Sequence, residues 1–594
     1  MIDYELAHGD KSVFHLPGYD PSTKIQEILR MGNIISEKET PQDLLTRVIN
    51  TLFLVENQFG TYLKDTKKMA EEFAEYMVEG YVMLGTPTLT NAGRYNTALS
   101  SCVIIPGDFH ERTQETEERI CSYYRQNMGS GFELQSYNDP VAMLTWINEL
   151  SARETLTGNY NRYIGNIGIL PISHPYIKEF IEIKRHKDMK HFNISIDVTE
   201  EFMRKAEEHM PFMLANGTTV EASVLLDLMA ENAWHNGEPG LIFLERMNKD
   251  NPVASISRYI GTPPCAEMGL AEGETCHFGY INVSNFVRDR GNRVNIDFDK
   301  LKRVTELLTR VLDNAIEYSI PRYPTSVSMD ISRMNRRIGI GVCGLADTFI
   351  AHELPYDSQE ARNLAKEVLS FINYVSKCTS VVLAEQRGSC LAMNFPTANM
   401  YMSGHFIEDK YARHATRLVS SHDWELLANT IRKTGKLRNI STTTLPPTGR
   451  ASILLDVAPS IEPMFSIFAN DGYIYKSIKK FLNKKLHENW PLLEKVYQEA
   501  TMSGSFQDIG ILPASIRACL KTAKELEPLA HIQMVADTAG LQGVIDESAS
   551  KTVNLPHEAT VKDVRNILLT AFHLGLKNIA LYRDQTRKDQ PMHL

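Results

Sequence analysis

Apolar residues recur at helical spacing from Thr40 onwards, after a lead-in with a looser pattern. The segment TPQDLLTRVINTLFLV starts with a threonine suited to cap a helix and a proline suited to its first turn. Apolar residues then return every three or four positions through KKMAEEFAEYMVEGYVML. The pattern predicts two or three amphipathic helices over residues 40–84, and we treat residues 1–84 as a helical N-terminal region.

After Gly85, short apolar segments alternate with longer amphipathic stretches over residues 85–594. We predict helices over residues 301–319, 358–386 and 560–575, and strands in LSSCVIIP, YIGNIGILPI, FNISIDV, GLIFL, INVSNF and RASILLD. Strands that alternate with helices over several hundred residues favour an α/β fold with a largely parallel sheet or barrel. Residues 85–594 are therefore expected to form an α/β domain.

The net charge and the length of the apolar runs argue against two classes of protein, those that bind nucleic-acid polymers and those that span a membrane. The chain of 594 residues carries 63 Lys and Arg against 73 Asp and Glu, a net charge of −10, so a broad basic face for a nucleic-acid polymer is not expected. No apolar run approaches the roughly 18 to 20 residues needed to span a membrane. The N-terminal MIDYELAHGDK has no signal-peptide pattern, and the expected location is the cytoplasm.

The cysteines are few for so long a chain. None of the eight forms a C-x-x-C pair, which argues against a disulfide framework or a zinc knuckle, and no metal site is predicted. Some of them are candidates for reactive thiols, whereas most are expected to be small buried apolar residues. They are Cys102, Cys121, Cys265, Cys276, Cys343, Cys378, Cys390 and Cys519.

The segment GTPPCAE places Cys265 two residues before Glu267. Two consecutive prolines exclude a regular helix or a central strand, so Cys265 is expected on a stiff loop. In an extended segment, residues two apart point the same way, and the thiol and the carboxylate would then face one site. Taken alone, the segment fits a packed cysteine beside a solvated glutamate better than a reactive site.

Two further cysteines lie on predicted strands, Cys102 in LSSCVIIP and Cys276 in ETCHFGYINVSNF. Each alone fits the hydrophobic core better than a reaction. They become a functional pair only if the fold brings the two strands side by side, and sequence spacing does not decide that.

Three glycine-containing turns are candidate anion sites. LPPTGRAS offers backbone N–H groups, hydroxyls and Arg450 ahead of a predicted strand, although the spacing of a Walker loop is absent. TPTLTNAG, which begins at Thr86, is a second hydroxyl-rich turn, and residues 128–131, MGSG, would let the backbone approach a phosphate closely. Each of them is also compatible with an ordinary turn.

Taken together and in order, these motifs resemble the catalytic chain of ribonucleotide reductases from about residue 40 to residue 584. This resemblance implies a ten-stranded α/β barrel of two five-stranded halves, with a central finger loop and a preceding helical region. It rests on eleven segments, TPTLTNAG, LSSCVIIP, MGSGF, FNISIDVTEEFM, GEPGLIFLERMNKDNP, PPCAE, ETCHFGYINVSNF, RRIGIGVCGLAD, LPPTGRASI, SIEPMF and ALYRD.

The resemblance also implies roles for individual residues. Cys265 corresponds to the cysteine that becomes a transient thiyl radical, and Glu267 to the general base at the ribose 3′ hydroxyl. Cys102 and Cys276 correspond to the dithiol that reduces the 2′ carbon and is left as a disulfide. The positions implied around the substrate and its phosphates are Thr86, Ser101, Gly129, Pro263, Pro447, Thr448, Gly449, Arg450, Ala451 and Ser452.

Pro263 departs from the family pattern, which has asparagine at this position and thus an amide that proline lacks. The C-terminus also lacks the usual cysteine pair, so an external, thioredoxin-like thiol reductant is expected. The segment LKNIALYRD has one tyrosine, Tyr582, and resembles the class II type that uses adenosylcobalamin.

The expected activity is the reduction of ribonucleoside di- or triphosphates to 2′-deoxyribonucleotides for DNA synthesis. ATP or deoxynucleoside triphosphate effectors and a homodimer are further implications of the resemblance. Three alternatives stay open: a class I chain that needs a metal-bearing radical subunit, a radical enzyme with another nucleotide reaction, and a silent regulatory homologue. Retention of Cys265, Glu267, Cys102 and Cys276 speaks against the last.

Overall fold

The computed structural model describes residues 13–107, 112–157, 163–289, 293–469 and 472–586. Helices α2 (Thr23–Met31), α3 (Pro41–Phe53) and α4 (Leu63–Val78), with the 3-10 helix η1 (Leu54–Phe59), precede the first strand. Thr40 caps α3 in a reciprocal capping box with Asp43, as the threonine–proline pattern predicts. The predicted helices over residues 40–84 are therefore confirmed as far as Val78.

The last part of that prediction is wrong, because β1 (Val82–Leu84) is a strand. It pairs antiparallel with β10 (Phe278–Asn282), and all three of its residues are buried. A run of three apolar residues does not distinguish a helix end from a buried strand.

Five strands form one parallel half of the barrel, in the spatial order β2, β3, β4, β5 and β8. Four of the six predicted strand segments contain one of them, and these four predictions are confirmed. The bounds are β2 Cys102–Ile104, β3 Gly129–Glu133, β4 Asn166–Pro171, β5 Phe192–Asp197 and β8 Gly240–Ile242.

A second set of five segments forms the other parallel half. β10 pairs with β13 (Gly339–Cys343), and single bridges then join Ile340 to Thr443 and Leu445 to Ala549. Ala549 lies just before β14 (Thr552–Leu555), which pairs with β15 (Asn578–Arg583). Every pairing within this half is parallel.

The two halves meet antiparallel at both seams, which completes the circuit. β15 pairs with β8 at one seam, and β2 pairs with β9 (Thr275–Cys276) at the other, where only His277 separates β9 from β10. The members are β14, β15, β8, β5, β4, β3, β2, the continuous β9–β10, β13 and residues 443–445. The ten-stranded α/β barrel that the resemblance implies is thereby confirmed.

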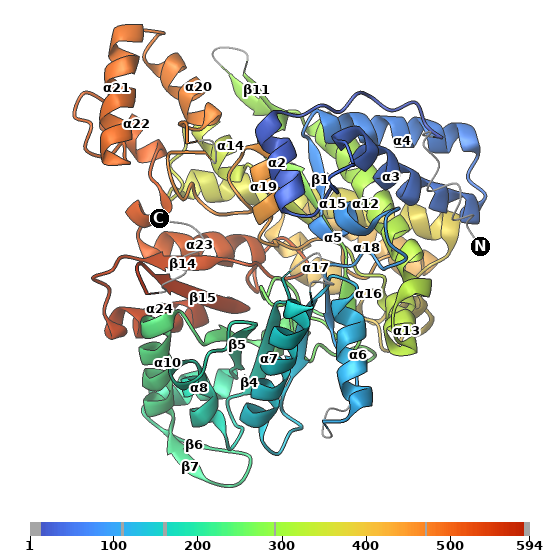
Figure 1. Cartoon of the computed structure of the whole chain (residues 1–594), viewed down its shortest axis with the longest axis vertical. Helices are drawn as coiled ribbons and strands as arrows, with labels where there is room; N and C mark the ends of the chain where they lie inside the picture. The colour runs from blue at the N-terminus through green and yellow to red at the C-terminus, as the bar shows by residue number, and fades with distance from the viewer. Residues whose placement is uncertain (1–12, 108–111, 158–162, 290–292, 470–471, 587–594) are drawn as a thin grey trace.

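Helices surround this circuit (Figure 1), and the predicted helices correspond to α12 (Phe298–Ser319), α15 (Gln359–Arg387) and α24 (Val561–His573). Helices α20, α21 and α22 project from the barrel with a hydrophobic cluster of their own.

The other helices are α5 Thr86–Asn91, α6 Gln114–Tyr124, α7 Pro140–Leu156, α8 Ile177–His186, α9 Glu200–Glu207, α10 Ala222–Asn236, α11 Leu244–Lys249, α13 Ser326–Asn335, α14 Leu345–Ala351, α16 Met400–Ser403, α17 Phe406–Lys410, α18 Ser421–Thr434, α19 Gly449–Leu455, α20 Lys476–Lys485, α21 Trp490–Ser503, α22 Ala514–Cys519 and α23 Pro528–Ala539. Two hairpins pair β6 (Pro211–Met213) with β7 (Thr219–Glu221) and β11 (Val287–Asp289) with β12 (Val294–Ile296).

Of the other two strand predictions, one is wrong and one is wrong in part. RASILLD lies in helix α19, where Ala451 and Leu454 are buried at helical spacing. INVSNF starts as the end of β10, but Val283–Phe286 is a 3-10 helix. Short apolar runs carry too little periodicity to decide between helix and strand.

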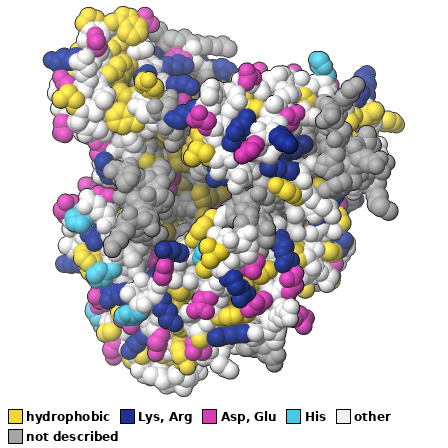
Figure 2. All heavy atoms as spheres, in the orientation of Figure 1, with side chains coloured by type: hydrophobic (Ala, Val, Ile, Leu, Met, Phe, Trp, Pro, Cys, Tyr) yellow, Lys and Arg dark blue, Asp and Glu magenta, His cyan; other side chains and the backbone are white. Residues whose placement is uncertain are grey.

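The distribution of charged side chains on the surface agrees with the similar numbers of acidic and basic residues in the sequence. On the face that Figure 2 shows, Lys and Arg are interspersed with Asp and Glu, and no continuous basic stripe is seen there. Among the described residues, no helix is both long and apolar enough to cross a membrane.

A buried arginine joins one seam of the barrel to a strand segment of its second half. Arg337 precedes β13 and donates to Glu274 at 2.7 Å, to Glu547 at 3.2 Å and to the Asn251 side chain at 2.9 Å. Glu274 lies directly before β9, and Glu547 lies two residues before the bridging Ala549. A buried arginine between two carboxylates neutralises charges that would otherwise be desolvated without a partner.

We predict that Arg337→Met destabilises the fold by about 3–5 kcal/mol, because it leaves buried carboxylates unpaired. The matched control is Arg333→Met on the preceding helix, where the Arg333 and Asp330 side chains are 46% and 74% exposed. Its expected cost is below about 1 kcal/mol. Urea unfolding followed by fluorescence measures both variants, and equal midpoints would contradict a structural role for Arg337.

Candidate active site

A short loop enters the barrel between its two halves. It comprises residues 262–269, and we call it the finger loop. The flanking Gly261 and Leu270 close it through an antiparallel bridge with N–H···O distances of 3.3 and 2.9 Å. At its tip, the Ala266 N–H donates to the Pro263 carbonyl at 2.9 Å, and Ala266 takes a left-handed backbone with φ 58°.

The prediction that Cys265 lies on a non-helical loop is confirmed, whereas residues 265–267 do not form the extended segment that would direct Cys265 and Glu267 to one face. The residues at the tip form a turn, because the prolines that exclude regular structure also favour a reversal of the chain. Cys265 is exposed at the tip, whereas Glu267 is buried with 2% exposure. The alternation that would direct both side chains to one face does not apply to a turn.

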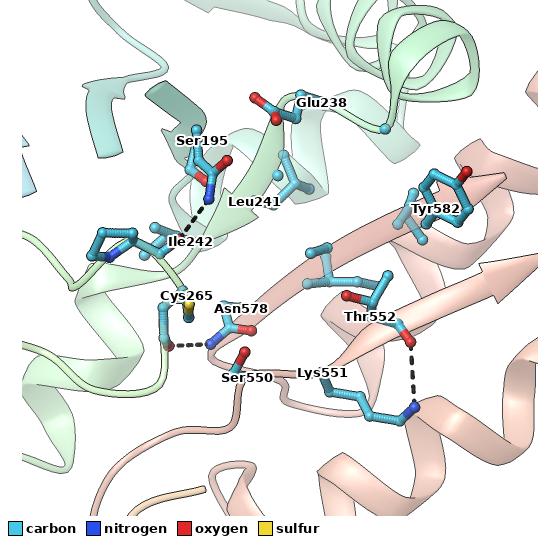
Figure 3. A pocket seen from close by; sticks show the side chains of 18 of the residues that line it. Ser195, Glu238, Leu241, Ile242, Cys265, Ser550, Lys551, Thr552, Asn578 and Tyr582 are labelled. Carbon is cyan, nitrogen blue, oxygen red and sulfur yellow. Dashed lines mark hydrogen bonds between the residues drawn. The ribbon is translucent and has the colours of Figure 1, made fainter. Parts of the chain in front are cut away.

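Both halves of the barrel bind the backbone of the finger loop. From the first half, the Asn193 amide on β5 donates to the Pro264 carbonyl at 3.0 Å. From the second half, the Asn578 amide on β15 donates to the Ala266 carbonyl at 2.6 Å, as Figure 3 shows. The Glu267 carbonyl accepts from the Thr444 hydroxyl at 2.6 Å and from the Ser548 N–H at 3.0 Å.

Two glycines on β3 allow the loop to approach the barrel wall. A Cβ atom on Gly131 would lie 2.4 Å from the Thr262 carbonyl oxygen, and one on Gly129 would lie 3.2 Å from Pro264 and 3.4 Å from the Cys102 sulfur. The MGSG segment is thus close to the finger loop. That Gly129 also borders a substrate stays a prediction.

Cys102 and Cys276 lie directly opposite each other on the antiparallel pair β2–β9. Their thiols lie close enough for Cys102 to raise the pKa of Cys276, and the Ser101 N–H donates to the Cys276 carbonyl at 2.8 Å. Opposite residues in an antiparallel pair have Cα atoms about 4.5–5.5 Å apart, within the range that a disulfide bridges. The structure therefore brings together two residues that the sequence separates widely.

Burial raises the pKa of the Cys276 thiol well above its ordinary value, and the Cys102 thiol and the Glu267 carboxylate raise it further. Cys276 is accordingly protonated at neutral pH, and Glu267 lies close enough to influence it. The three groups form one buried cluster beneath the finger loop.

Cys265 also borders a cavity of ≈350 Å³ (Figure 3). Cys102, Cys276 and Glu267 are absent from the described residues that line it. Its walls come from β5, β8, β14 and β15, together with the finger loop. The lining residues include Ile167, Asn193, Ile194, Ser195, Glu238, Leu241, Ile242, Pro264, Ala266, Phe465, Ser550, Lys551, Thr552, Asn554, Asn578, Ile579, Ala580, Leu581 and Tyr582.

The expected phosphate turn is the start of helix α19. Thr448, with φ 54°, precedes the helix, and its hydroxyl accepts from the Ser460 N–H at 2.8 Å. The Ser452 hydroxyl donates to the Gly449 carbonyl at 2.9 Å, and Arg450 donates to the Gly32 carbonyl at 3.2 Å. Arg450 is thus in contact with the N-terminal helices.

Thr86 and this turn lie in one region. The expected turn at Thr86 is a short helix, α5, whose Leu89 lines a small cavity together with Leu454 of α19. Next to Thr86, a Cβ atom on Gly85 would lie 3.3 Å from the Ser101 hydroxyl oxygen. Thr444, which binds the Glu267 carbonyl, lies three residues before Pro447. Thr86 therefore lies near Ser101, the neighbour of Cys102, and the role of these positions around a substrate stays a prediction.

Sequence reasoning missed three residues that hold the loop, namely Asn193, Asn578 and Thr444, and it expected the close approach at Gly131 to involve a phosphate, whereas the neighbour is Thr262 of the loop. Polar side chains at inward positions of otherwise apolar strands were the available signal for the two asparagines. Within the described residues, no group of three or more His, Cys, Asp and Glu side chains is arranged to hold a metal ion.

Comparison with known proteins identifies the family. A model described as "Ribonucleotide reductase, barrel domain" matches residues 130–582, and one described as "Ribonucleotide reductase, all-alpha domain" matches residues 29–97. The barrel model covers more than half of the chain, which therefore belongs to the ribonucleotide reductase family.

Particular relatives are similar over most of their length. A vitamin B12-dependent ribonucleoside-diphosphate reductase of Thermoplasma acidophilum is 31% identical over 546 residues, which cover 87% of this chain and 65% of the relative. A protein of the same name from Mycobacterium tuberculosis is 28% identical, over 93% of this chain and 77% of the relative. This chain thus spans about two thirds to three quarters of the length of these relatives.

A solved structure supports the fold. The Actinobacillus ureae class Id ribonucleotide reductase alpha subunit matches with a TM-score of 0.71 and 18% identity, over 95% of this chain and 97% of that one.

We predict that mild oxidation with diamide joins Cys102 to Cys276 selectively, because their positions in the strand pair need little movement. Peptide mass spectrometry after non-reducing digestion identifies the bridge. Cys121 and Cys343, which are buried and have thiol pKa values raised by burial, serve as internal controls and should stay reduced. Cross-linking of Cys102 or Cys276 to any other cysteine would contradict the assigned pair.

Proposed function

We propose that this chain reduces ribonucleotides to 2′-deoxyribonucleotides, with Cys265 as the thiyl radical and Cys102 with Cys276 as the reductant. The observation that carries the proposal is the arrangement around the finger loop. A pair of contacting thiols lies beside a buried carboxylate, and a third thiol stands at the tip of a loop that both halves of the barrel hold.

Each of the four residues carries out a separate step of the proposed reaction. The Cys265 sulfur radical takes the hydrogen atom from the ribose 3′ carbon, and Glu267 accepts the proton of the 3′ hydroxyl. The 2′ hydroxyl leaves as water after it receives a proton from the dithiol. Cys102 and Cys276 become a disulfide: one of their two hydrogens leaves in the water, the other replaces the hydroxyl on the 2′ carbon, and the pair supplies two electrons. Glu267 then returns its proton to the 3′ oxygen, and Cys265 returns the hydrogen atom to the 3′ carbon.

The raised pKa of Cys276 supports the role of the dithiol as the proton donor to the 2′ hydroxyl. A thiol that stays protonated at neutral pH can deliver a proton to a leaving hydroxyl, whereas a thiolate cannot. Re-reduction of the disulfide then requires an external thiol reductant, which we propose to be thioredoxin-like.

For the radical source we propose adenosylcobalamin. The relatives from Thermoplasma acidophilum and Mycobacterium tuberculosis are named vitamin B12-dependent, and LKNIALYRD has a single tyrosine. When bound, adenosylcobalamin supplies an organic radical able to remove a hydrogen atom from a thiol. The cavity at Cys265, at ≈350 Å³, fits its nucleoside part between apolar walls such as Leu241 and Ile579, and the corrin ring would stay outside.

The names of these relatives also favour a ribonucleoside diphosphate over a triphosphate as the substrate. We propose that backbone N–H groups at residues 449–451 bind its phosphates, with Thr86, Ser101, Gly129 and Ser452 around them. Thr448 keeps a hydroxyl hydrogen to donate, because its oxygen accepts from Ser460. ATP or deoxynucleoside triphosphate effectors, a homodimer, a role in DNA synthesis and a cytoplasmic location complete the proposal.

Pro263 motivates a second candidate, radical chemistry on a nucleotide with a different outcome. Its carbonyl accepts from the Ala266 N–H at 2.9 Å and the Thr262 hydroxyl at 3.0 Å, so Pro263 shapes the finger loop and offers no amide donor. The intact dithiol favours reduction, since a reaction without net reduction needs neither Cys102 nor Cys276.

We predict that Cys265→Ser abolishes deoxynucleotide formation while nucleotide binding persists, because an O–H bond is too strong to supply the radical. The assay combines the full chain, a ribonucleoside diphosphate, adenosylcobalamin and dithiothreitol, with products identified by mass spectrometry. Equilibrium dialysis measures nucleotide binding.

The matched control is Cys519→Ser on helix α22, which should retain wild-type turnover because Cys519 does not line the cavity at Cys265. Turnover by Cys265→Ser within about tenfold of the wild type would overturn the assignment, since loss of a radical centre costs far more. Wild-type turnover that requires a metal-bearing partner subunit instead of cobalamin would favour the class I alternative.

A further inference from the structure

A chain of side-chain hydrogen bonds joins the two strands that carry Cys102 and Cys276. Thr275 and His277 flank Cys276, and neighbouring residues of a strand point to opposite faces of a sheet, so the chain lies on the face opposite to the Cys276 side chain. Five buried residues make up the chain, which we call the seam network: Ser100, Thr275, His277, Ser319 and Tyr323.

Tyr323 links the two strands directly. Its hydroxyl oxygen lies 2.6 Å from the Ser100 hydroxyl oxygen and 2.7 Å from the Thr275 hydroxyl oxygen. Ser100 is two residues before Cys102, and Thr275 is the residue before Cys276. A phenolic hydroxyl donates one hydrogen bond and accepts others, so one oxygen can serve both strands. Burial raises the pKa of Tyr323, and the nearby Cys276 raises it further.

His277 forms a second link. Its Nε2 lies 3.0 Å from the Ser100 hydroxyl oxygen and 3.1 Å from that of Ser319, the last residue of α12. The Ser319 hydroxyl donates its one hydrogen to the Ala315 carbonyl at 2.7 Å, so the Nε2 of His277 carries the hydrogen that joins the two side chains. Burial lowers the pKa of His277 to about 3, and the ring is therefore neutral at physiological pH.

The histidine carries a cost in stability. Its Nδ1 has no hydrogen-bond partner among the described residues, and the side chain is buried with 1% exposure. An unpaired buried polar atom has lost its hydration and gained nothing in return, so such atoms are rare. An apolar ring would suit a purely structural position better, which indicates that the N–H of His277 has a role beyond stability.

The backbone ladder at this seam is short. The register of β2 with β9 contains two residue pairs, Cys102 with Cys276 and Val103 with Thr275. A disulfide forms without strain only when the Cα atoms of its cysteines lie within a narrow range of distances. Side-chain links that hold the two strands together therefore act directly on the separation of the two thiols.

We propose that Tyr323 and His277 are positioning residues for the dithiol: their hydrogen bonds hold the strands of Cys102 and Cys276 at the separation that a disulfide requires, and they thereby set how readily the disulfide is reduced. This inference rests on the proposed function, in which the pair is the reductant, and it assigns the groups that tune it. Without these links the two thiols meet less often, and the disulfide becomes less stable relative to the dithiol.

The test measures the equilibrium between the dithiol and the disulfide in the full chain, in buffers with fixed ratios of reduced to oxidised dithiothreitol. Each exchange breaks the S–S bond of the reagent and forms the one between Cys102 and Cys276, while two hydrogens and two electrons pass to the reagent. Acid quenching, alkylation in denaturant and peptide mass spectrometry give the ratio of the two forms, and no turnover is needed.

Tyr323→Phe and Thr275→Val both break the link through Tyr323. Each should lower the equilibrium constant for disulfide formation roughly three- to tenfold, as for one neutral hydrogen bond, which corresponds to about 14–30 mV for a two-electron couple. The double variant should be no worse than either single variant, because both changes remove the same link. Adding His277→Phe to Tyr323→Phe should lower the constant further, because it removes the second link.

The matched control is Tyr401→Phe. Tyr323 and Tyr401 are both 3% exposed, and the Tyr401 hydroxyl donates to the Ile440 carbonyl at 2.8 Å. Tyr401 belongs to a hydrophobic cluster separate from the one that contains Tyr323 and the two cysteines. We expect this control to lose stability in urea unfolding and to keep the wild-type equilibrium between dithiol and disulfide.

A wild-type equilibrium constant in both Tyr323→Phe and Thr275→Val would overturn the proposal. An equal shift in Tyr401→Phe would overturn it too, because the effect would then be a general loosening of the core. An unchanged constant on addition of His277→Phe would contradict the part assigned to His277. If Tyr323→Phe fails to fold, Thr275→Val still decides the question, because it replaces a side chain by one of the same shape.

This inference and the proposed function fail separately. If the wild type forms deoxynucleotides while the variants keep the wild-type equilibrium constant, the proposed function stands and the role of the seam network is wrong. If the variants shift the constant but the wild type forms no deoxynucleotide with any radical source, the seam network stands and the proposed reaction is wrong.

Discussion

The arrangement of the active site depends on hydrogen bonds to the carbonyl groups of one eight-residue loop. Asn193 binds this loop from one half of the barrel, and Asn578, Thr444 and Ser548 bind it from the other. Backbone carbonyls accept these bonds, so the tip is held without using the side chains of Cys265 and Glu267. If either half shifted, the loop would lose part of its support, and the two halves and the loop therefore act as one unit.

The antiparallel seam between β2 and β9 brings the two cysteines of the dithiol together. Because β2 and β9 run in opposite directions, Cys102 and Cys276 meet as a direct pair although they belong to different halves. The finger loop leads into β9, so the chain that carries Cys265 and Glu267 also carries one member of the dithiol. One continuous segment thus sets the positions of all the reactive groups except Cys102.

The sequence predicted the parts of the fold that local pattern controls. The Thr40 cap, the strands around Ile104 and Ile169 and the long helices follow from spacing and from capping residues. Residues 450–456 were predicted wrongly, because a short apolar run has no clear period. The left-handed Ala266 at the tip of the loop was not predicted, because it depends on bonds from distant residues. The anchors Asn193 and Asn578 act through tertiary contacts that no local pattern reports. The motifs in family order supplied the candidate site residues, whereas the direct pairing of Cys102 with Cys276 required the structure.

The most direct test of the account replaces Gly131 by alanine and compares this with Gly165→Ala. A Cβ atom on Gly131 would lie 2.4 Å from the Thr262 carbonyl oxygen, whereas one on Gly165 has no atom within 4 Å. The measurement is the rate at which iodoacetamide alkylates Cys265, together with turnover. We expect Gly131→Ala to displace the loop, to change the alkylation rate severalfold and to abolish turnover in a chain that still folds, while Gly165→Ala matches the wild type. Wild-type alkylation and turnover in Gly131→Ala would contradict a loop held in place by the barrel.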